Sequence, residues 1–202
     1  MKTRLKRIPD LVDLFYPNRL WSQKDNSKIF LTFDDGPHPQ ITPWLIEFLK
    51  FEKIKASFFL LGKNVDSFPE LYQEIIKEKH TIGSHGYLHL KYQRDIKDEY
   101  YANFLKGRQV IESEYFRPPY GKIDKAMVRR IGVDVKIVMW KWMSYDFDES
   151  VSDNEIFTSS NQVRKGDITV FHENERSSIR IQRILPVLVE RFRNRGFEFA
   201  AL

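Results

Sequence analysis

The sequence predicts an α/β fold in which parallel strands alternate with helices. Short β-prone runs alternate with helical stretches along most of the chain, and polar residues cluster where several of those runs end. Such alternation is typical of a parallel sheet with helical crossovers, which is either open and doubly wound or closed into a barrel. Periodicity alone does not choose between these two architectures.

Seven runs of β-forming residues are predicted as strands. A short helix near the N-terminus and a polar run at 22–28 precede the first of them. Thr42 is expected to be the N-cap of one helix, and Ser67 with Glu70 to form a capping box for the next. A third, amphipathic helix is expected over about 92–112. The predicted strands are 28–33, 56–61, 80–84, 115–118, 135–140, 167–171 and 197–200.

Length and composition indicate one globular domain. The chain has 202 residues, 42% of them hydrophobic, which is enough to bury a full core. We divide it into an N-terminal extension with a short helix over 1–27 and a main domain over 28–202. The absence of cysteine excludes disulfides and thiolate metal sites.

Charge and hydropathy argue against a nucleic-acid partner and against a membrane span. The net charge is +5, but the basic residues are mixed with 28 acidic ones, so nucleic acid is not predicted as a partner. No run approaches the roughly 20 apolar residues that a membrane span needs. The basic N-terminus lacks the apolar stretch of a secretory signal, so the location is left open, with the cytoplasm as the default.

Polar residues follow the ends of five predicted strands. In either parallel architecture these ends lie on one face, which is the face where active sites are built. This convergence predicts where the active site lies. The residues are Asp34 and Asp35, Ser84 and His85, Arg117, Asp146 and Asp148, and His172.

Two adjacent carboxylates end the first apolar strand, where one of them must point inward. Burying a carboxylate is costly unless a cation or hydrogen bonds compensate. His85 and His89 stand four apart, so on a helical turn both can hold one metal, with a carboxylate as the third ligand. The remaining carboxylate is then placed to act as a general base toward zinc-bound water. Taken without the carboxylates, His85 and His89 can also be two ordinary surface or capping histidines that bind no metal.

Three further residues suit hydrolysis of an acyl or amide carbonyl by such a site. Arg117 can orient the base and keep it ionised through a bidentate contact. The backbone N–H of Tyr120, in the rigid turn RPPYG, can stabilise an oxyanion, and His172 can act as general acid. Each residue also has an ordinary structural interpretation. Arg117 can form a surface ion pair, the turn around Tyr120 can be purely structural, and His172 can be a structural histidine.

Five segments resemble, in order, the five motifs of the polysaccharide deacetylases of carbohydrate esterase family 4, or NodB-homology domains. The resemblance spans nearly the whole chain after residue 28 and implies a distorted (β/α) barrel with about seven parallel strands. It also implies removal of N-acetyl, or less often O-acetyl, groups from a glycan. The segments are TFDDGP at 32–37, SHGYLH at 84–89, RPPYG at 117–121, SYDFD at 144–148 and VFH at 170–172.

The resemblance implies a role for each matching residue. The resemblance implies that Asp35, His85 and His89 hold a metal, which is expected to be Zn²⁺ or another divalent ion such as Co²⁺. Its catalytic residues are Asp34 as base, Arg117 as the partner of that base, Tyr120 as backbone oxyanion donor and His172 as acid. Its substrate groove includes Pro118, Trp140, Asp146 and Val170.

The fourth motif departs from the family pattern. Met143 stands where an acidic residue usually supports Arg117, and Phe147 stands where Trp is usual. Asp146 or Asp148 is expected to substitute as that support. This departure keeps a non-catalytic sugar-binding barrel open as an alternative function.

A third candidate function is a carbon–nitrogen hydrolase of the same barrel type that acts on a small amide. For the deacetylase, the expected partner is an acetylated glycan, and no protein partner is predicted. Chitin oligomers, peptidoglycan and xylan all suit the resemblance, and the basic surface mildly favours an anionic wall polymer.

Overall fold

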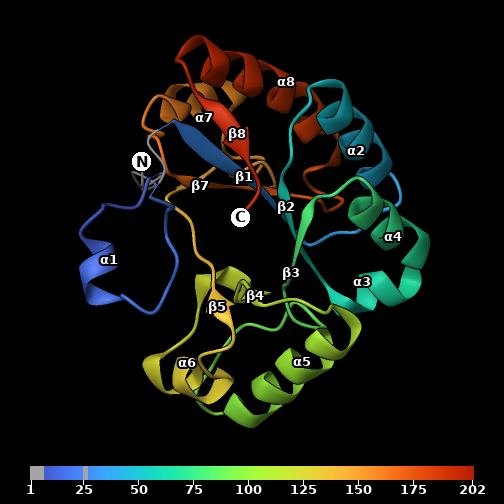
Figure 1. Ribbon diagram of the computed structural model, residues 1–202, viewed down its shortest axis with the longest axis vertical. Coiled ribbons are helices and arrows are strands. Elements are labelled where there is room, and N and C mark those ends of the chain that lie inside the picture. The colour runs from blue at the N-terminus through green and yellow to red at the C-terminus, as the bar shows by residue number, and fades with distance from the viewer. Residues whose placement is uncertain (1–6, 25–26) are drawn as a thin grey trace.

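A single parallel sheet forms the middle of the structure, a computed structural model that describes residues 7–24 and 27–202 (Figure 1). Its strands are β1 (Lys28–Asp34), β2 (Ser57–Leu60), β3 (Thr81–Ser84), β4 (Tyr115–Phe116), β5 (Lys136–Ile137), β6 (Trp142–Met143), β7 (Ile168–His172) and β8 (Glu198–Ala200). The order is β5-β4-β3-β2-β1-β7-β6, and β8 pairs with the beginning of β1. Every pair of neighbouring strands is parallel, which confirms the predicted α/β fold with its curled, barrel-like sheet.

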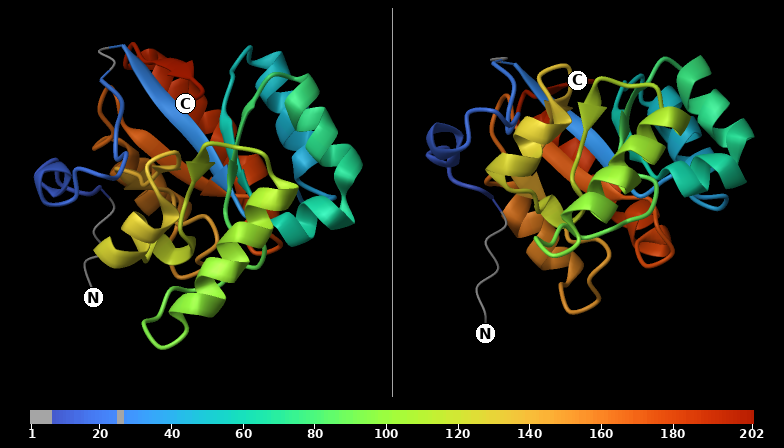
Figure 2. Two further views of the ribbon diagram at one scale, coloured as in Figure 1. Left: turned by 60° about the horizontal axis from the view of Figure 1, so that its bottom comes forward. Right: turned by 90° about the horizontal axis from the view of Figure 1, so that it is seen from below.

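Helices surround the outer side of this sheet (Figures 1 and 2). They are α1 (Val12–Phe15), α2 (Thr42–Phe51), α3 (Gly62–Ser67), α4 (Pro69–Lys77), α5 (Lys97–Val110), α6 (Lys125–Ile131), α7 (Asp153–Ser160) and α8 (Ser178–Asn194), with a 3₁₀ turn at Pro119–Gly121. None of the helices in the described ranges has the length and apolar character that crossing a membrane requires.

Both predicted helix caps are wrong, because each side chain has another partner. Thr42 is the first residue of α2, and its hydroxyl donates to Glu173 Oε1 at 2.5 Å. Ser67 ends α3, an element the sequence did not predict, and its hydroxyl donates to the Lys63 carbonyl oxygen. α5 also begins later than predicted, at Lys97.

Only Lys136–Ile137 of the strand predicted at 135–140 forms a strand, β5, while β6 (Trp142–Met143) begins beyond the predicted end and lies at the opposite edge of the sheet. β5 pairs with β4, and β6 pairs with β7, so this one segment joins the two edges and curls the sheet. The N-terminal segment pairs with the chain directly after β5, where Leu20 and Val138 form a parallel bridge. Leu20 donates its N–H to the Ile137 carbonyl and accepts from the Met139 N–H.

The rest of the described N-terminal segment is also held against the barrel. Arg7 Nε lies 3.0 Å from Asp167 Oδ2, and the buried Lys141 Nζ donates to Asp13 at 2.6 Å. Trp21 is buried with the side chains around α5 and α6. The division of the chain after residue 27 remains a prediction.

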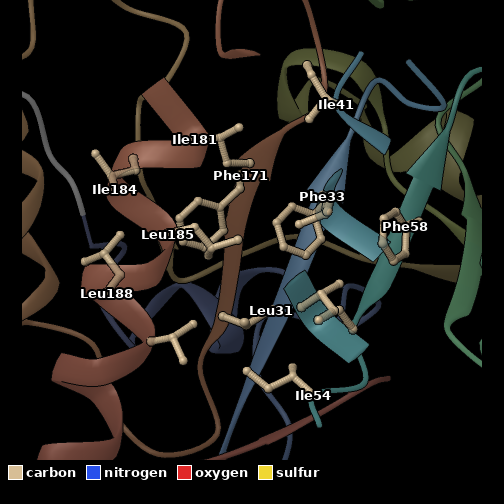
Figure 3. Packing of buried hydrophobic residues seen from close by; sticks show 14 of the residues in the cluster. Leu31, Phe33, Ile41, Ile54, Phe58, Phe171, Ile181, Ile184, Leu185 and Leu188 are labelled. Atoms are coloured by element: carbon tan, nitrogen blue, oxygen red, sulfur yellow. The ribbon is translucent and has the colours of Figure 1, made fainter. Parts of the chain in front are cut away.

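The alternation of β1 sorts its side chains between two environments. Ile29, Leu31 and Phe33 face the helical layer, where the Phe33 ring lies 5.3 Å from Phe58 and 5.7 Å from Phe171 (Figure 3). Because successive side chains of a strand point to opposite faces, the residues between them point into the barrel. Asp34 therefore enters the barrel at the C-terminal end of its central strand.

Candidate active site

A pocket of about 660 Å³ opens where β1 and β7 end. Asp34 and His172, the last residues of these strands, both line it. Most of the predicted site residues share this pocket, as the parallel fold requires. Those on its wall are Asp34, Asp35, His85, His89, Pro118, Tyr120, Trp140 and His172.

Three side chains in the pocket form a candidate metal site. Asp35 Oδ1 lies 3.5 Å from His89 Nε2 and 3.7 Å from His85 Nε2. This oxygen is buried and has no hydrogen-bond partner. A buried carboxylate oxygen without a donor is costly, and a cation among these three atoms would compensate it. One carboxylate and two imidazoles form a donor set that suits Zn²⁺.

The surroundings of His85 favour the form that binds a metal. Its Nδ1 lies 2.7 Å from the Arg117 carbonyl oxygen, which can only accept, so Nδ1 carries the hydrogen. Burial lowers the pKa of His85 to about 3, so the ring is neutral. Its Nε2 lone pair therefore faces Asp35.

Arg117 is fully buried and holds Asp34 through one nitrogen. Nη1 donates to Asp34 Oδ1 at 2.6 Å and to Thr32 Oγ1 at 2.7 Å, while Nη2 donates to the Met139 carbonyl at 3.2 Å. The predicted bidentate contact with Asp34 is wrong, because Thr32 and Asp34 both point into the barrel and share Nη1. Backbone carbonyls, rather than an acidic side chain, satisfy the rest of the guanidinium.

Asp146 supports His172 and lies behind it. Asp146 Oδ1 lies 2.7 Å from His172 Nδ1, and Oδ2 accepts the His172 backbone N–H at 2.8 Å. Burial alone would lower the pKa of His172, but the charge and hydrogen bond of Asp146, followed by the charges of Asp35 and Asp34, raise it to about 9. The ring is therefore protonated at neutral pH.

Two residues predicted to form the substrate groove are not on its wall. Asp146 and Val170 are fully buried, and neither lines the pocket. Asp146 is turned toward His172, as described above, and Val170 lies in the middle of β7. The sequence predicted that Asp146 could support Arg117 in place of the missing acidic residue. This prediction is wrong, because the Asp146 carboxylate contacts His172 instead.

The turn that carries Tyr120 has an unusual backbone. Tyr120 has a φ of 59°, and its ring packs against His89 with centroids 4.5 Å apart. Gly121 follows with a φ of 63°, and a Cβ there would come within 2.6 Å of the Trp140 ring. A non-glycine residue in the left-handed region is costly, so the surrounding packing must hold this turn against the pocket.

Sequence reasoning missed three polar residues around the aspartates. Asn64 donates a hydrogen bond to the Asp35 backbone carbonyl, and Asn174 donates one to Asp35 Oδ2. Burial raises the pKa of Glu173 to about 8, and its Oε2 has no hydrogen-bond partner. Asn174 carried a local signal, since it stands three residues before Ser177 at the start of a helix, but Asn64 carried none.

Comparisons with known proteins agree on one family. Residues 22–135 match the family model described as polysaccharide deacetylase. A peptidoglycan-N-acetylglucosamine deacetylase of Bacillus cereus is 32% identical over 200 residues, which is 90% of either chain. The peptidoglycan-N-acetylglucosamine deacetylase PgdA of Listeria monocytogenes is 28% identical over 188 residues. That match covers 89% of this chain, but only 39% of the longer relative.

A solved structure is similar over nearly the whole chain. The crystal structure of the Bc1960 peptidoglycan N-acetylglucosamine deacetylase, in complex with an N-hydroxybenzamide compound, superposes with a TM-score of 0.81 at 28% sequence identity. The match covers 96% of this chain and 95% of that one. The fold and its parallel strand arrangement are therefore those of the deacetylase structure.

Proposed function

The chain belongs to the polysaccharide deacetylase family, and we propose that it removes N-acetyl groups from an amino-sugar glycan. One observation carries this proposal: Asp35, His85 and His89 converge in the pocket that Asp34 and His172 also line. The relatives described above are named for peptidoglycan, which makes fragments of that polymer the first substrate to test. The net charge of +5 is consistent with an anionic wall polymer.

We assign the metal to Asp35, His85 and His89. The donor set and the unpaired Asp35 Oδ1 fit a divalent cation, for which Zn²⁺ is our first choice and Co²⁺ the second. When bound, such an ion supplies Lewis-acid polarisation of the acyl oxygen and lowers the pKa of water to about 7.

Residues of the chain accept and donate the protons of the reaction and stabilise the negative charge that develops on the acyl oxygen. Asp34 accepts a proton from the attacking water, and Arg117 holds that carboxylate in place. The backbone N–H of Tyr120 donates to the oxyanion as water adds to the carbonyl carbon. The carbon–nitrogen bond then breaks, and His172 gives its Nε2 proton to the leaving nitrogen. The products are acetate and a free amine on the sugar.

The altered fourth motif does not argue for a non-catalytic barrel. Loss of an acidic residue at position 143 would weaken the site if it left Arg117 without support. Thr32 and the carbonyl of Met139 accept hydrogen bonds from the guanidinium instead. We therefore expect the variant motif to retain the base and its partner in a competent arrangement.

Mass spectrometry of N-acetylglucosamine oligomers and peptidoglycan fragments tests the proposed function. Incubation with Zn²⁺-loaded protein is expected to remove acetyl groups, and chelator-treated protein is expected to leave them in place. Removal that is equally fast after chelation would contradict the metal assignment. No removal from any glycan, including acetylated xylan, would favour a binding module.

The Asp146→Asn variant is expected to narrow the pH range of activity on its alkaline side. His172 must be protonated to act as the acid, and its raised pKa of about 9 keeps it so through neutral pH. Removing the anion that stabilises the imidazolium lowers this pKa, so the alkaline limb of kcat/KM should move at least about one unit toward acid. The pH profile of kcat/KM for wild type and variant measures the shift.

A matched substitution away from the pocket controls for loss of an aspartate. Asp153 pairs with Arg183 at the surface, so Asp153→Asn should leave the alkaline limb unchanged. A bound cation acts on both proteins alike, and the comparison therefore isolates Asp146. An unshifted limb in Asp146→Asn would remove His172 from the role of acid.

A further inference from the structure

The backbone of Asp35 is held in an unusual conformation by contacts from neighbouring elements. Its φ is 80°, in the left-handed region that residues with a Cβ rarely adopt. The Asp35 N–H donates to the Phe59 carbonyl at 3.1 Å, and Asn64 Nδ2 donates to the Asp35 carbonyl oxygen at 2.7 Å. The backbone that carries the Asp35 side chain is therefore held in place by the protein's own contacts.

The two carboxylate oxygens of Asp35 have different environments. Oδ2 accepts a hydrogen bond from Asn174 Nδ2 at 2.8 Å. Oδ1 is buried, has no hydrogen-bond partner, and faces the Nε2 atoms of His85 and His89. The hydrogen bond from Asn174 thus distinguishes the oxygen that faces the two histidines from the one that does not.

The start of α8 determines which end of the Asn174 amide faces Asp35. The Ser177 backbone N–H donates to Asn174 Oδ1 at 3.1 Å, and the Asn174 backbone N–H donates to the Ser177 hydroxyl oxygen at 3.2 Å. Because the amide oxygen is engaged by a donor, the NH₂ group is the end that points at Asp35. The loop that leads into α8 therefore aims a donor at the candidate metal site.

We propose that Asn174 is a positioning residue that reserves Asp35 Oδ1 for the metal and restricts Asp35 to one-oxygen coordination. This inference rests on the proposed function. A carboxylate with both oxygens free can bind a cation through either one or through both. With Oδ2 held by Asn174, fewer coordination positions are filled by Asp35, and more are left for water and the substrate carbonyl.

Metal binding by Asn174→Ser tests this role. Serine keeps an oxygen that can accept from the Ser177 N–H, but its side chain is too short to carry a donor to Asp35. Asn154→Ser, on the exposed surface of α7, is the matched control. The dissociation constants of Zn²⁺ and Co²⁺ are measured by competition with a chromophoric chelator, and the visible absorption spectrum of the Co²⁺ protein reports its coordination number.

We expect Asn174→Ser to bind both ions about 10–100-fold more weakly than wild type, with a Co²⁺ spectrum shifted toward higher coordination number. The thermal midpoint of the metal-free variant should stay close to that of wild type, and Asn154→Ser should match wild type throughout. Unchanged affinity and spectrum in Asn174→Ser would overturn the inference while leaving the proposed function intact. Failure of wild type itself to bind either ion would overturn both.

Discussion

Replacement of Asp34 by asparagine is expected to lower kcat by about 10²–10⁴-fold and to leave metal affinity unchanged. The amide has nearly the same shape as the carboxylate and can still accept a hydrogen bond from Arg117, but it cannot take a proton from water. Steady-state deacetylation rates and metal titration of the same preparation measure the two properties separately.

His85→Ala provides the contrast, because it removes a proposed ligand instead of the base. We expect it to lose both metal binding and activity, since the remaining pair of ligands offers too few donors. An Asp34→Asn protein with more than a tenth of wild-type activity would show that another group takes the proton. A zinc-free, fully active His85→Ala protein would contradict the ligand assignment.

Arg117→Ala is expected to destabilise the fold by about 3–5 kcal/mol, because it leaves the buried Asp34 carboxylate without its cation. For a chain of this size, that loss lowers the melting temperature by roughly 6–20 °C. Urea unfolding of the variant, followed by circular dichroism, measures the change in free energy. Arg108→Ala on the exposed face of α5 should change it by no more than about 0.5 kcal/mol.

The double variant Asp34→Asn/Arg117→Ala separates charge from packing. With both charges gone, no ion is left buried and unpaired, so the double variant should be less destabilised than the sum of the two single variants. Strict additivity would mean that the two side chains do not depend on each other in the folded protein. A cost below about 1 kcal/mol for Arg117→Ala alone would contradict the importance of the buried pair.

The parts of the site that follow from strand alternation were predictable from the sequence. β1 is a continuous apolar run, and the period of two sends Phe33 to the helical layer and Asp34 into the barrel. The parallel order then brings His172, at the end of β7, beside it. Local pattern and the handedness of parallel crossovers are sufficient for this level of the structure.

The parts that the sequence did not predict depend on contacts between distant segments. The strand predicted at 135–140 ends early, at Ile137, and Leu20 from the N-terminal segment forms the backbone hydrogen bonds with Ile137 and Met139 there. The partners of Asp146 and Asn174 are set by how loops from different strands meet, and residue type alone does not reveal them. Thr42 is a residue type that often caps helices, but its hydroxyl donates to the Glu173 carboxylate and does not cap α2.

The pairing of β1 has a consequence for how the chain is made. Its partner β7 is distant along the chain, as in the hydrogen bond between Thr32 and Thr169, which are 137 residues apart. At the usual rate of about 5–20 residues per second, the ribosome delivers β7 roughly 7–27 s after β1. During that interval β1 is an apolar, β-prone segment with one edge unpaired. Chaperones bind segments of this kind, and without chaperones such segments self-associate.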